Sequence, residues 1–305
     1  MIRPQHLNEG DTIGIVAPSG PVQREKLERA LPFFEGLGLH VKLGKHVFRG
    51  YGYLAGTDAE RLEDFHEMIA DPEVKAVICA RGGYGAGRIV PHLDFELIRT
   101  NPKIIWGYSD ITYLHTAIRQ QTGLVTFHGP MPASDIAKEQ FDDLSAQMFR
   151  QLFQPADLVY SEKIAPLYAN CSAPAEGELV GGNLSLLVST LGTPYEIETA
   201  GKILLLEDIG EEPYRVDGML NQLKLAGKLS GVAGIAIGDF SGGEPSKDPS
   251  LLLNDVFDHY LYQLNVPVLS GFRIGHCLPH FAVPLGTRAI LSGAEKQLKI
   301  KAGVC

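Results

Sequence analysis

The sequence predicts an α/β protein with two domains, the first built on a parallel sheet and the second with more antiparallel content. Strand-like apolar runs alternate with amphipathic helix-like runs through the first half, a pattern typical of a parallel sheet covered by helices on both faces. The chain has 305 residues, which is long for a single core. Hydrophobic residues make up 45% of it, enough for a core in each half.

The first domain is expected over residues 1–155. Its apolar runs predict strands at residues 12–18, 40–44, 74–80, 102–108 and 123–129. Helical spacing predicts helices at residues 22–38, 57–72, 110–121 and 139–155, and Thr57 is a suitable N-cap for the second of them. In such sheets ligands bind beyond the carboxyl ends of the strands, so the loops there are the places to look for chemistry.

A linker is expected at residues 156–175, which contain prolines and no clear period. The second domain is expected over residues 176–305. It reads as a strand, glycine turn and helix at 176–194, a strand at 201–208, a helix at 212–227, a strand at 231–240 and a helix at 249–264. The end of the chain, residues 286–303, reads as a hairpin.

Charge and composition exclude several classes of function. A net charge of −9 argues against a nucleic-acid partner, because phosphate binding requires a basic surface. No secretory signal and no apolar run of membrane-spanning length is present, so we expect no membrane association. The four cysteines are scattered without a CxxC pair, and no HExxH motif occurs, so we expect a cytoplasmic protein without a metal site.

A glycine-rich loop, "RGGYGAGR" at residues 81–88, follows a predicted strand. It matches neither the GxGxxG fingerprint nor the P-loop. It is either a turn that needs positive φ angles or a loop whose bare backbone approaches a ligand. The sequence leaves these two interpretations evenly balanced.

Ser109 lies between the strand at 102–108 and the helix that begins near Asp110. It could cap that helix, although Asp110 could do so equally well. Alternatively, it is a nucleophile on a strand-to-helix elbow, with the N–H of the next residue facing an oxyanion. The sequence G-Y-S-D-I has the first glycine of GxSxG but not the second, so the motif alone is weak.

A nucleophilic serine needs a base and a group that orients the base. Of ten histidines, His276 stands out because it lies in a loop punctuated by glycine and proline just after a strand, and His280 in the same loop is its competitor. Glu207 ends an apolar strand, where an acid is costly to bury unless it is paired. Asp208, Glu211 and Glu212 are more simply read as caps of the next helix.

Seven ordered segments together resemble the LD-carboxypeptidases, the serine peptidase family that includes muramoyltetrapeptide carboxypeptidase and the microcin C immunity hydrolases. They are "APSGPV", "RGGYGAGRIVPHLD", "IIWGYSDIT", "HGPM", "LVGGNLSLL", "LLLEDIGEEPYRVDGMLNQL" and "IGHCLPHFAVPLG". The resemblance implies a flavodoxin-like N-terminal domain and a smaller C-terminal domain. It also implies a triad of Ser109, Glu207 and His276, with an oxyanion hole formed by the N–H groups of Asp110 and Gly83.

The implied activity is release of the terminal D-alanine from a cytoplasmic murein tetrapeptide during wall recycling, without a cofactor and by a homodimer. A carboxypeptidase must hold the terminal carboxylate, and Arg81, Arg215 and Arg273 are candidates in or beside the motifs, as is Arg88. One departure from the family is Gly218, where a second arginine is common.

Three alternatives remain open at this stage. The first is a microcin C-type immunity hydrolase acting on an aminoacyl-nucleotide, although Trp106 is the only tryptophan available to stack on a base. The second is a non-catalytic nucleotide-binding module that uses the glycine loop, which would leave Glu207 and His276 unexplained. The third is a cysteine hydrolase that uses Cys277 or Cys79.

Overall fold

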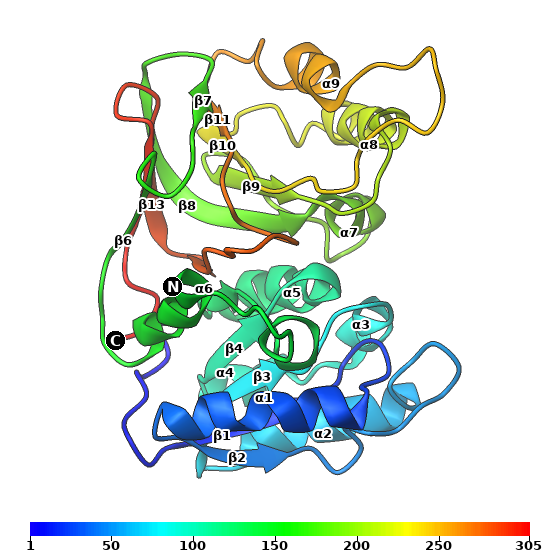
Figure 1. Cartoon of the computed structure of the whole chain (residues 1–305), viewed down its shortest axis with the longest axis vertical. Helices are drawn as coiled ribbons and strands as arrows, with labels where there is room; N and C mark the ends of the chain where they lie inside the picture. Colours follow the sequence, from blue (N-terminus) through cyan, green and yellow to red (C-terminus); the bar gives the residue numbers. More distant parts are fainter. The chain divides into compact units, whose positions relative to one another are not determined.

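A computed structural model describes all residues from 1 to 305, and the chain divides into two compact units. The first unit comprises Met1–Ala156, Ala282–Gly286 and Ala302–Cys305. The second comprises Asp157–Phe281 and Thr287–Lys301. Both are drawn in Figure 1, where the first is coloured from blue to green apart from its two short red C-terminal segments, and the second from green to red.

The first unit has a flavodoxin-like fold. Its six-stranded sheet has the order β12-β5-β4-β3-β1-β2, in which β2, β1, β3, β4 and β5 are parallel and β12 joins β5 antiparallel. The order 2-1-3-4-5 is that of flavodoxin-like sheets, which bind ligands where the order reverses, beyond β1 and β3. The strands are β1 Thr12–Val16, β2 His40–Leu43, β3 Val74–Cys79, β4 Ile104–Gly107, β5 Thr126–His128 and β12 Val283–Leu285.

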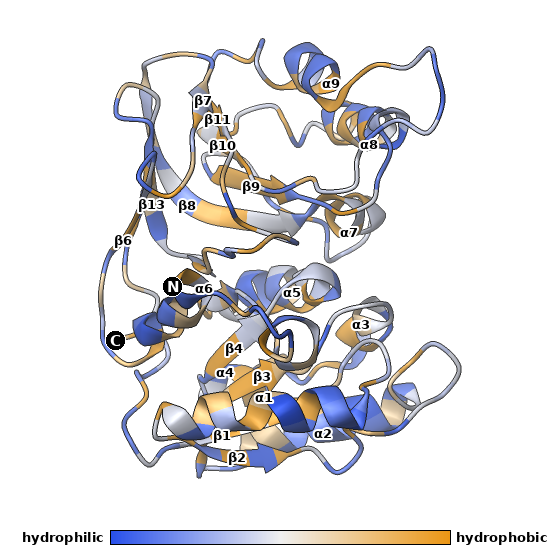
Figure 2. Ribbon diagram, viewed as in Figure 1, coloured by the Kyte–Doolittle hydropathy of each residue, from blue (hydrophilic) through white to orange (hydrophobic).

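The helices of the first unit are α1 Arg24–Gly36, α2 Asp58–Ala70, α3 Ala86–Ile89, α4 Phe95–Thr100, α5 Thr112–Thr122 and α6 Asp143–Gln147. Helix α2 begins as the sequence predicts, because Thr57 and Glu60 form a reciprocal capping box. The central strand β4 is buried along its whole length, and Figure 2 shows part of it in the hydrophobic colour. Trp106 of this strand belongs to the core, where its indole N–H donates to the Pro130 carbonyl at 2.8 Å.

The second unit contains an eight-stranded mixed sheet of order β6-β14-β13-β8-β9-β10-β11-β7. Strands β8, β9, β10 and β11 are parallel, and the remaining pairs are antiparallel. The strands are β6 Leu158–Ser161, β7 Tyr168–Ala169, β8 Pro174–Asn183, β9 Ile203–Glu207, β10 Gly234–Ile237, β11 Val268–Ser270, β13 Arg288–Ser292 and β14 Gln297–Ile300. Helices α7 Leu184–Ser189, α8 Pro213–Leu225 and α9 Leu253–Tyr260 pack their apolar residues against β8, β9 and β10. The predicted terminal hairpin is β13 and β14.

The segment expected as a linker, 156–175, contains two strands of the second unit's sheet. Strand β6 pairs with β14 at one edge, and β7 pairs with β11 at the other. Such short edge strands depend on distant partners and not on a local period, so the sequence pattern does not reveal them. None of the helices combines the length and apolar character that crossing a bilayer requires.

Candidate active site

Ser109 lies on a strained elbow in the first unit. Strand β4 ends at Gly107, and Ser109 begins a single 3₁₀ turn, Ser109–Ile111, that leads into α5. Its φ angle is +61°, in the left-handed region that residues with a side chain rarely adopt. The capping position is Tyr108, which makes no side-chain cap. Ser109 is therefore not the N-cap, and its backbone has the strain that is typical of a nucleophile elbow.

The glycine loop after β3 contacts this elbow directly. A side chain at Gly82 would place its Cβ 2.9 Å from Cβ of Ser109 and 3.0 Å from its Oγ, so only glycine fits there. Gly83 and Gly85 adopt φ angles of +118° and +126°. The turn interpretation is therefore confirmed at Gly83 and Gly85, and the approach of this loop's backbone to a ligand stays a prediction. Positive φ explains Gly83 and Gly85, whereas Gly82 must be glycine because its backbone packs closely against Ser109.

Asp110 follows the elbow and ties it to α3. Its carboxylate is 1% exposed and accepts a hydrogen bond from the Ala86 N–H at 2.8 Å. Burial raises the pKa of this carboxyl, and the Ser19 hydroxyl and the Ala86 N–H oppose that rise. The side chain of Asp110 thus has a structural partner. The oxyanion role predicted for its N–H and for that of Gly83 stays a prediction.

Arg61, which the sequence analysis did not single out, joins the loops that surround the elbow. It is a helix residue with a fully buried guanidinium, which donates to the carbonyls of Pro18 and Gly85. It also forms an ion pair with Asp58. The loops after β1 and β3 are therefore fixed by one buried cation. An arginine in a polar helix reads as exposed, so no pattern in the sequence marks it.

Glu207 and His276 come together in the second unit. Glu207 is the last residue of β9 and is fully buried, and its Oε2 lies 2.8 Å from Nδ1 of His276. If Nδ1–H donates to the carboxylate, Nε2 is left as a proton acceptor, which is the arrangement of a base held by an acid. The imidazole against Glu207 is that of His276, whereas His280 is buried in the same loop.

Glycine makes room for this pair as well. A side chain at Gly275, where φ is +124°, would place its Cβ 2.6 Å from Oε2 of Glu207. At Gly238, a Cβ would lie 2.3 Å from the Ile274 carbonyl oxygen and 3.1 Å from Cβ of Glu207. The backbone at Gly238 and Gly275 therefore packs so closely that neither position has room for a side chain.

The neighbouring acids have structural roles, which differ from the helix capping expected for them. Asp208 accepts hydrogen bonds from Asn183, Ile209 and Ser185, which hold the start of α7, and burial raises its pKa. Glu212 stands at the cap position of α8 but binds Ser246 instead. Glu211 pairs with Arg215 one turn along α8. Glu207 takes part in none of these structural contacts.

The thiols are poorly suited to nucleophilic attack. Burial raises the pKa of Cys277 to about 12, and burial also raises the pKa of Cys79. A thiol with such a pKa is protonated at neutral pH and is a weak nucleophile. This disfavours the cysteine-hydrolase alternative.

The candidate arginines lie in different surroundings. Arg81 donates to the Pro21 carbonyl at 3.0 Å and to that of Gly82 at 3.2 Å, so it lies on the glycine loop. Arg273 donates to the Leu278 carbonyl at 2.6 Å, within the loop that contains His276. Arg215 is an exposed residue of α8 paired with Glu211. Arg88 makes a bidentate ion pair with Asp58.

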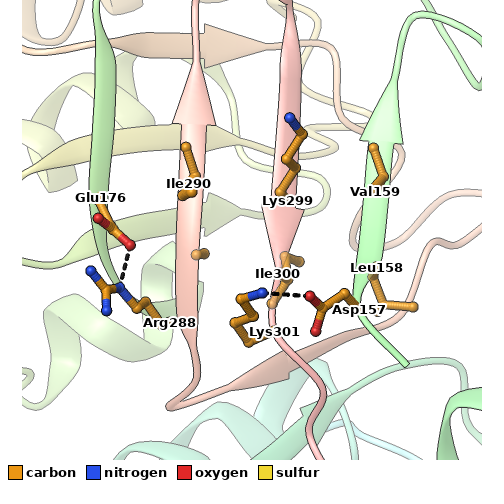
Figure 3. Close-up of a pocket in the computed structure, with 10 residues that line it drawn as sticks. Asp157, Leu158, Val159, Glu176, Arg288, Ile290, Lys299, Ile300 and Lys301 are labelled. Atoms are coloured by element: carbon orange, nitrogen blue, oxygen red, sulfur yellow. Dashed lines mark hydrogen bonds and ion pairs between the residues drawn. The ribbon is translucent and has the colours of Figure 1, made fainter. Parts of the chain in front are cut away.

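A surface pocket of the second unit lies apart from these residues. It is formed on β6, β14, β13 and β8, and Figure 3 shows its lining side chains and two ion pairs, Arg288–Glu176 and Lys301–Asp157. The pocket contains neither the Glu207–His276 pair nor any candidate arginine. We assign it no part in the chemistry.

Comparison with known proteins identifies the family. Residues 13–129 match the model of the LD-carboxypeptidase N-terminal domain, and residues 176–291 match that of the C-terminal domain. The chain belongs to the LD-carboxypeptidase family, as its motifs predict, and it is a serine carboxypeptidase.

Named relatives cover nearly the whole chain. The chain is 55% identical to the "Probable murein peptide carboxypeptidase" of Bacillus subtilis (strain 168), covering 99% of this chain and 95% of that protein. A crystal structure of muramoyltetrapeptide carboxypeptidase from Oxalobacter formigenes is 31% identical, with a TM-score of 0.86, covering 95% of this chain and 98% of that one. A structure of MccF in complex with glutamyl sulfamoyl guanosine is 26% identical, with a TM-score of 0.90, covering 99% and 98%. These likenesses confirm the predicted two-domain α/β fold.

Proposed function

We propose that this enzyme releases the terminal D-alanine from murein tetrapeptides of the form L-Ala–D-Glu–meso-diaminopimelate–D-Ala. The names of the Bacillus and Oxalobacter proteins support this substrate class. The observation that carries the chemistry is the hydrogen bond between the buried Glu207 and His276, at 2.8 Å. An acid that is completely buried beside an imidazole has a ready explanation as the orienting member of a triad.

In this proposal Ser109, His276 and Glu207 act together. The Ser109 hydroxyl attacks the carbonyl of the diaminopimelate L-centre while its proton passes to Nε2 of His276. The imidazolium is stabilised by Glu207. The tetrahedral intermediate collapses as His276 protonates the departing D-alanine amine, which leaves an acyl-enzyme on Ser109. Water, deprotonated by His276, then hydrolyses that ester and regenerates the serine.

Backbone donors and an arginine complete the proposed site. The N–H groups of Asp110 and Gly83 would stabilise the oxyanion, and the strained elbow supports this role for Asp110 because it follows the serine directly. The substrate's terminal carboxylate would pair with a guanidinium. Arg81 and Arg273 are favoured over Arg215, because each lies on the same loop as Gly82 or His276.

We propose further that the enzyme acts in the cytoplasm in wall recycling, as a homodimer. Four unpaired cysteines are in keeping with a reducing compartment. Gel filtration with light scattering tests the dimer. Fractionation of the source cells tests the location.

The decisive assay offers two peptides to the purified protein. We expect D-alanine to be released from the tetrapeptide, and mass spectrometry monitors this release. We expect little from a pentapeptide ending D-Ala–D-Ala, because its scissile carbonyl belongs to a D-residue and its extra residue displaces the carboxylate. Ser109→Ala is the matched control. Faster cleavage of the pentapeptide would contradict the LD assignment.

A second candidate is hydrolysis of an aminoacyl-nucleotide toxin, which the likeness to MccF favours. Trp106 could not stack on a nucleobase in such an enzyme, because it is fully buried in the core. Incubation with an aminoacyl sulfamoyl nucleoside, with product analysis by mass spectrometry, tests this candidate. A third, non-catalytic nucleotide binding, leaves the Glu207–His276 pair without a purpose.

A further inference from the structure

A buried arginine of the first unit bonds two loops that flank the candidate nucleophile. Arg61 lies on α2, and its side chain has no exposed surface. One of its terminal nitrogens, Nη1, donates to the carbonyl of Pro18, after β1, and to that of Gly85, after β3, the latter at 2.8 Å. Its other terminal nitrogen pairs with Asp58. A desolvated charge is costly unless it is fully bonded, so these partners determine what the cation can hold in place.

The Gly85 carbonyl belongs to a peptide group that is bonded on both sides. The same peptide group carries the N–H of Ala86, which donates to Oδ2 of Asp110 at 2.8 Å. The C=O and N–H of a trans peptide point in opposite directions, so this one group lies between the Arg61 cation and the Asp110 carboxyl. Hydrogen bonds in such a chain polarise and strengthen one another. Arg61 and Asp110 are therefore linked through one peptide group.

Asp110 connects this peptide group to the elbow. It directly follows Ser109 in the turn Ser109–Ile111, and its own N–H is the donor proposed above for the oxyanion. Its side chain is 1% exposed, so bulk water is not available to replace the Ala86 N–H as a partner. A shift of the peptide group would therefore move the Asp110 side chain, and with it the backbone at Ser109 that has a φ of +61°.

The bond from Arg61 to Pro18 restrains the elbow from a second direction. The loop after β1 lies against the glycine loop, because the Gly20 N–H donates to the Gly82 carbonyl at 3.2 Å. Gly82 in turn packs against the Ser109 side chain. One guanidinium therefore restrains both the loop that supports Gly82 and the peptide group that holds the residue after the serine.

The geometry of these contacts requires an arginine. A Cβ at Gly85 would lie 2.9 Å from Nη1 of Arg61, and the φ angle of Gly85 is +126°, so glycine is what allows the guanidinium to approach. A lysine at position 61 would carry the same charge on a single flexible nitrogen. It would lack the planar fork that bonds two carbonyls and Asp58 at once.

We propose that Arg61 is a positioning residue, which holds the Ser109 elbow in its reactive geometry through the Gly85–Ala86 peptide group and the Asp110 carboxyl. This inference rests on the proposed function and extends it to a residue that acts only through others. Its loss should lower kcat more than it changes KM, because the attack depends on the placement of the serine hydroxyl more steeply than substrate binding does.

The kinetic test compares two buried cations of the first unit. Arg61→Met should lower kcat for D-alanine release about 10²-fold and Arg61→Lys about tenfold, with KM changed less than about threefold. The matched control is Lys103→Met. Lys103 is 7% exposed and likewise donates to two carbonyls, those of Met68 and Asp71, but it precedes β4, at the end opposite to Ser109. Its loss should lower the unfolding midpoint and keep kcat within about twofold.

A double-mutant cycle tests the link to Asp110. If Arg61 acts through the peptide group, Asp110→Ala should lower kcat about as much as Arg61→Lys does. The double variant should then lose little more than either single variant. Urea denaturation of the same four proteins measures the coupling without turnover. The free energy of unfolding lost in the double variant should be smaller than the sum of the two single losses.

Three outcomes would overturn the proposal. The first is additive loss in the cycle, which would show that Arg61 and Asp110 act independently. The second is an equal loss of kcat in Arg61→Lys and Lys103→Met, which would show that any buried cation serves. The third is a raised KM with kcat unchanged, which would place Arg61 in substrate binding. If even the parent releases no D-alanine, the proposed function fails, whereas the stability cycle still decides whether Arg61 and Asp110 are linked.

Discussion

The two units hold their candidate catalytic residues by different physical means. In the first unit Ser109 is positioned by its backbone, which has a φ of +61° and packs closely against Gly82. In the second unit His276 is positioned by a side chain, the fully buried Glu207 to which it is hydrogen-bonded. The free-energy cost is conformational strain in the first unit and desolvation of a carboxylate in the second.

This difference teaches which substitutions separate function from stability. Where strain is in the backbone, replacing the residue can relieve it, so a dead variant can be more stable than its parent. Where a buried charge is held by one partner, removal of that partner leaves an uncompensated group and lowers stability as well. The predictions below contrast the two cases, beginning with the largest effect.

Substitution of Ser109 should have the largest effect on turnover. Ser109→Ala and Ser109→Gly should each lower kcat by about 10⁴-fold or more, since the nucleophile is lost. Ser109→Gly should also raise the free energy of unfolding by about 1 kcal/mol relative to Ser109→Ala, because glycine accepts positive φ without strain. D-alanine release and urea denaturation measure the two quantities. Wild-type turnover in Ser109→Ala would refute the nucleophile assignment.

Glu207 and Asp208 are adjacent acids that should respond differently. Glu207→Gln should lower kcat by about 10³- to 10⁴-fold through a misoriented imidazole. Asp208→Asn should keep most of the activity but destabilise the fold by about 1–3 kcal/mol, because Asp208 accepts hydrogen bonds from Asn183, Ile209 and Ser185. Kinetics and denaturation of both variants test this. An inactive Asp208→Asn with normal stability would reverse the two roles.

The histidines provide the matching pair of controls. His276→Ala should abolish turnover, whereas His280→Ala should keep a measurable kcat, because the imidazole bonded to Glu207 is that of His276. The readout is the same release of D-alanine, with the unfolding midpoint as a check on His280, which is buried. Loss of activity in the second variant alone, with a normal midpoint, would transfer the role of base.

Substitution of glycines tests how closely the backbone must pack around Ser109 and around Glu207. Gly82→Ala should push Ser109 out of place and lower kcat by about 10²-fold. Gly275→Ala meets both a positive φ and a contact of 2.6 Å with Glu207, so it should lose stability and activity together. The control is Gly218→Ala, since a Cβ at this exposed residue of α8 meets nothing within 4 Å. An unaffected kcat in Gly82→Ala would mean that the loop at Gly82 moves without displacing Ser109, which would contradict the prediction.

Much of the first unit was predictable, because its strands and longer helices have local periods. Strands β6 and β7 were not predicted, since their pairing depends on residues far along the chain. Helices α3 and α4 were not predicted either, because 4 and 6 residues are too few to show a helical period. The candidate residues Ser109, Glu207 and His276 could be chosen from turn chemistry and from the cost of burying an acid. The sequence does not reveal the contact with Glu207 that distinguishes His276 from His280, nor the burial of Arg61, because both depend on residues far apart in the chain.

The smallest expected effect is a pH dependence of stability due to Asp110. Burial raises its folded-state pKa above the unfolded value, so the folded state holds this proton more tightly. Its neutral form is favoured at low pH, and the free energy of unfolding should fall as pH rises from the unfolded pKa through the folded one, then level off. Asp110→Asn removes this titration, so the difference between variant and parent should change only across that window. Urea denaturation at a series of pH values from about 3.5 upward measures it, since unperturbed aspartate titrates near 3.9. A parent whose stability relative to Asp110→Asn rises with pH would contradict the assigned direction and would mean that the Ala86 N–H outweighs burial.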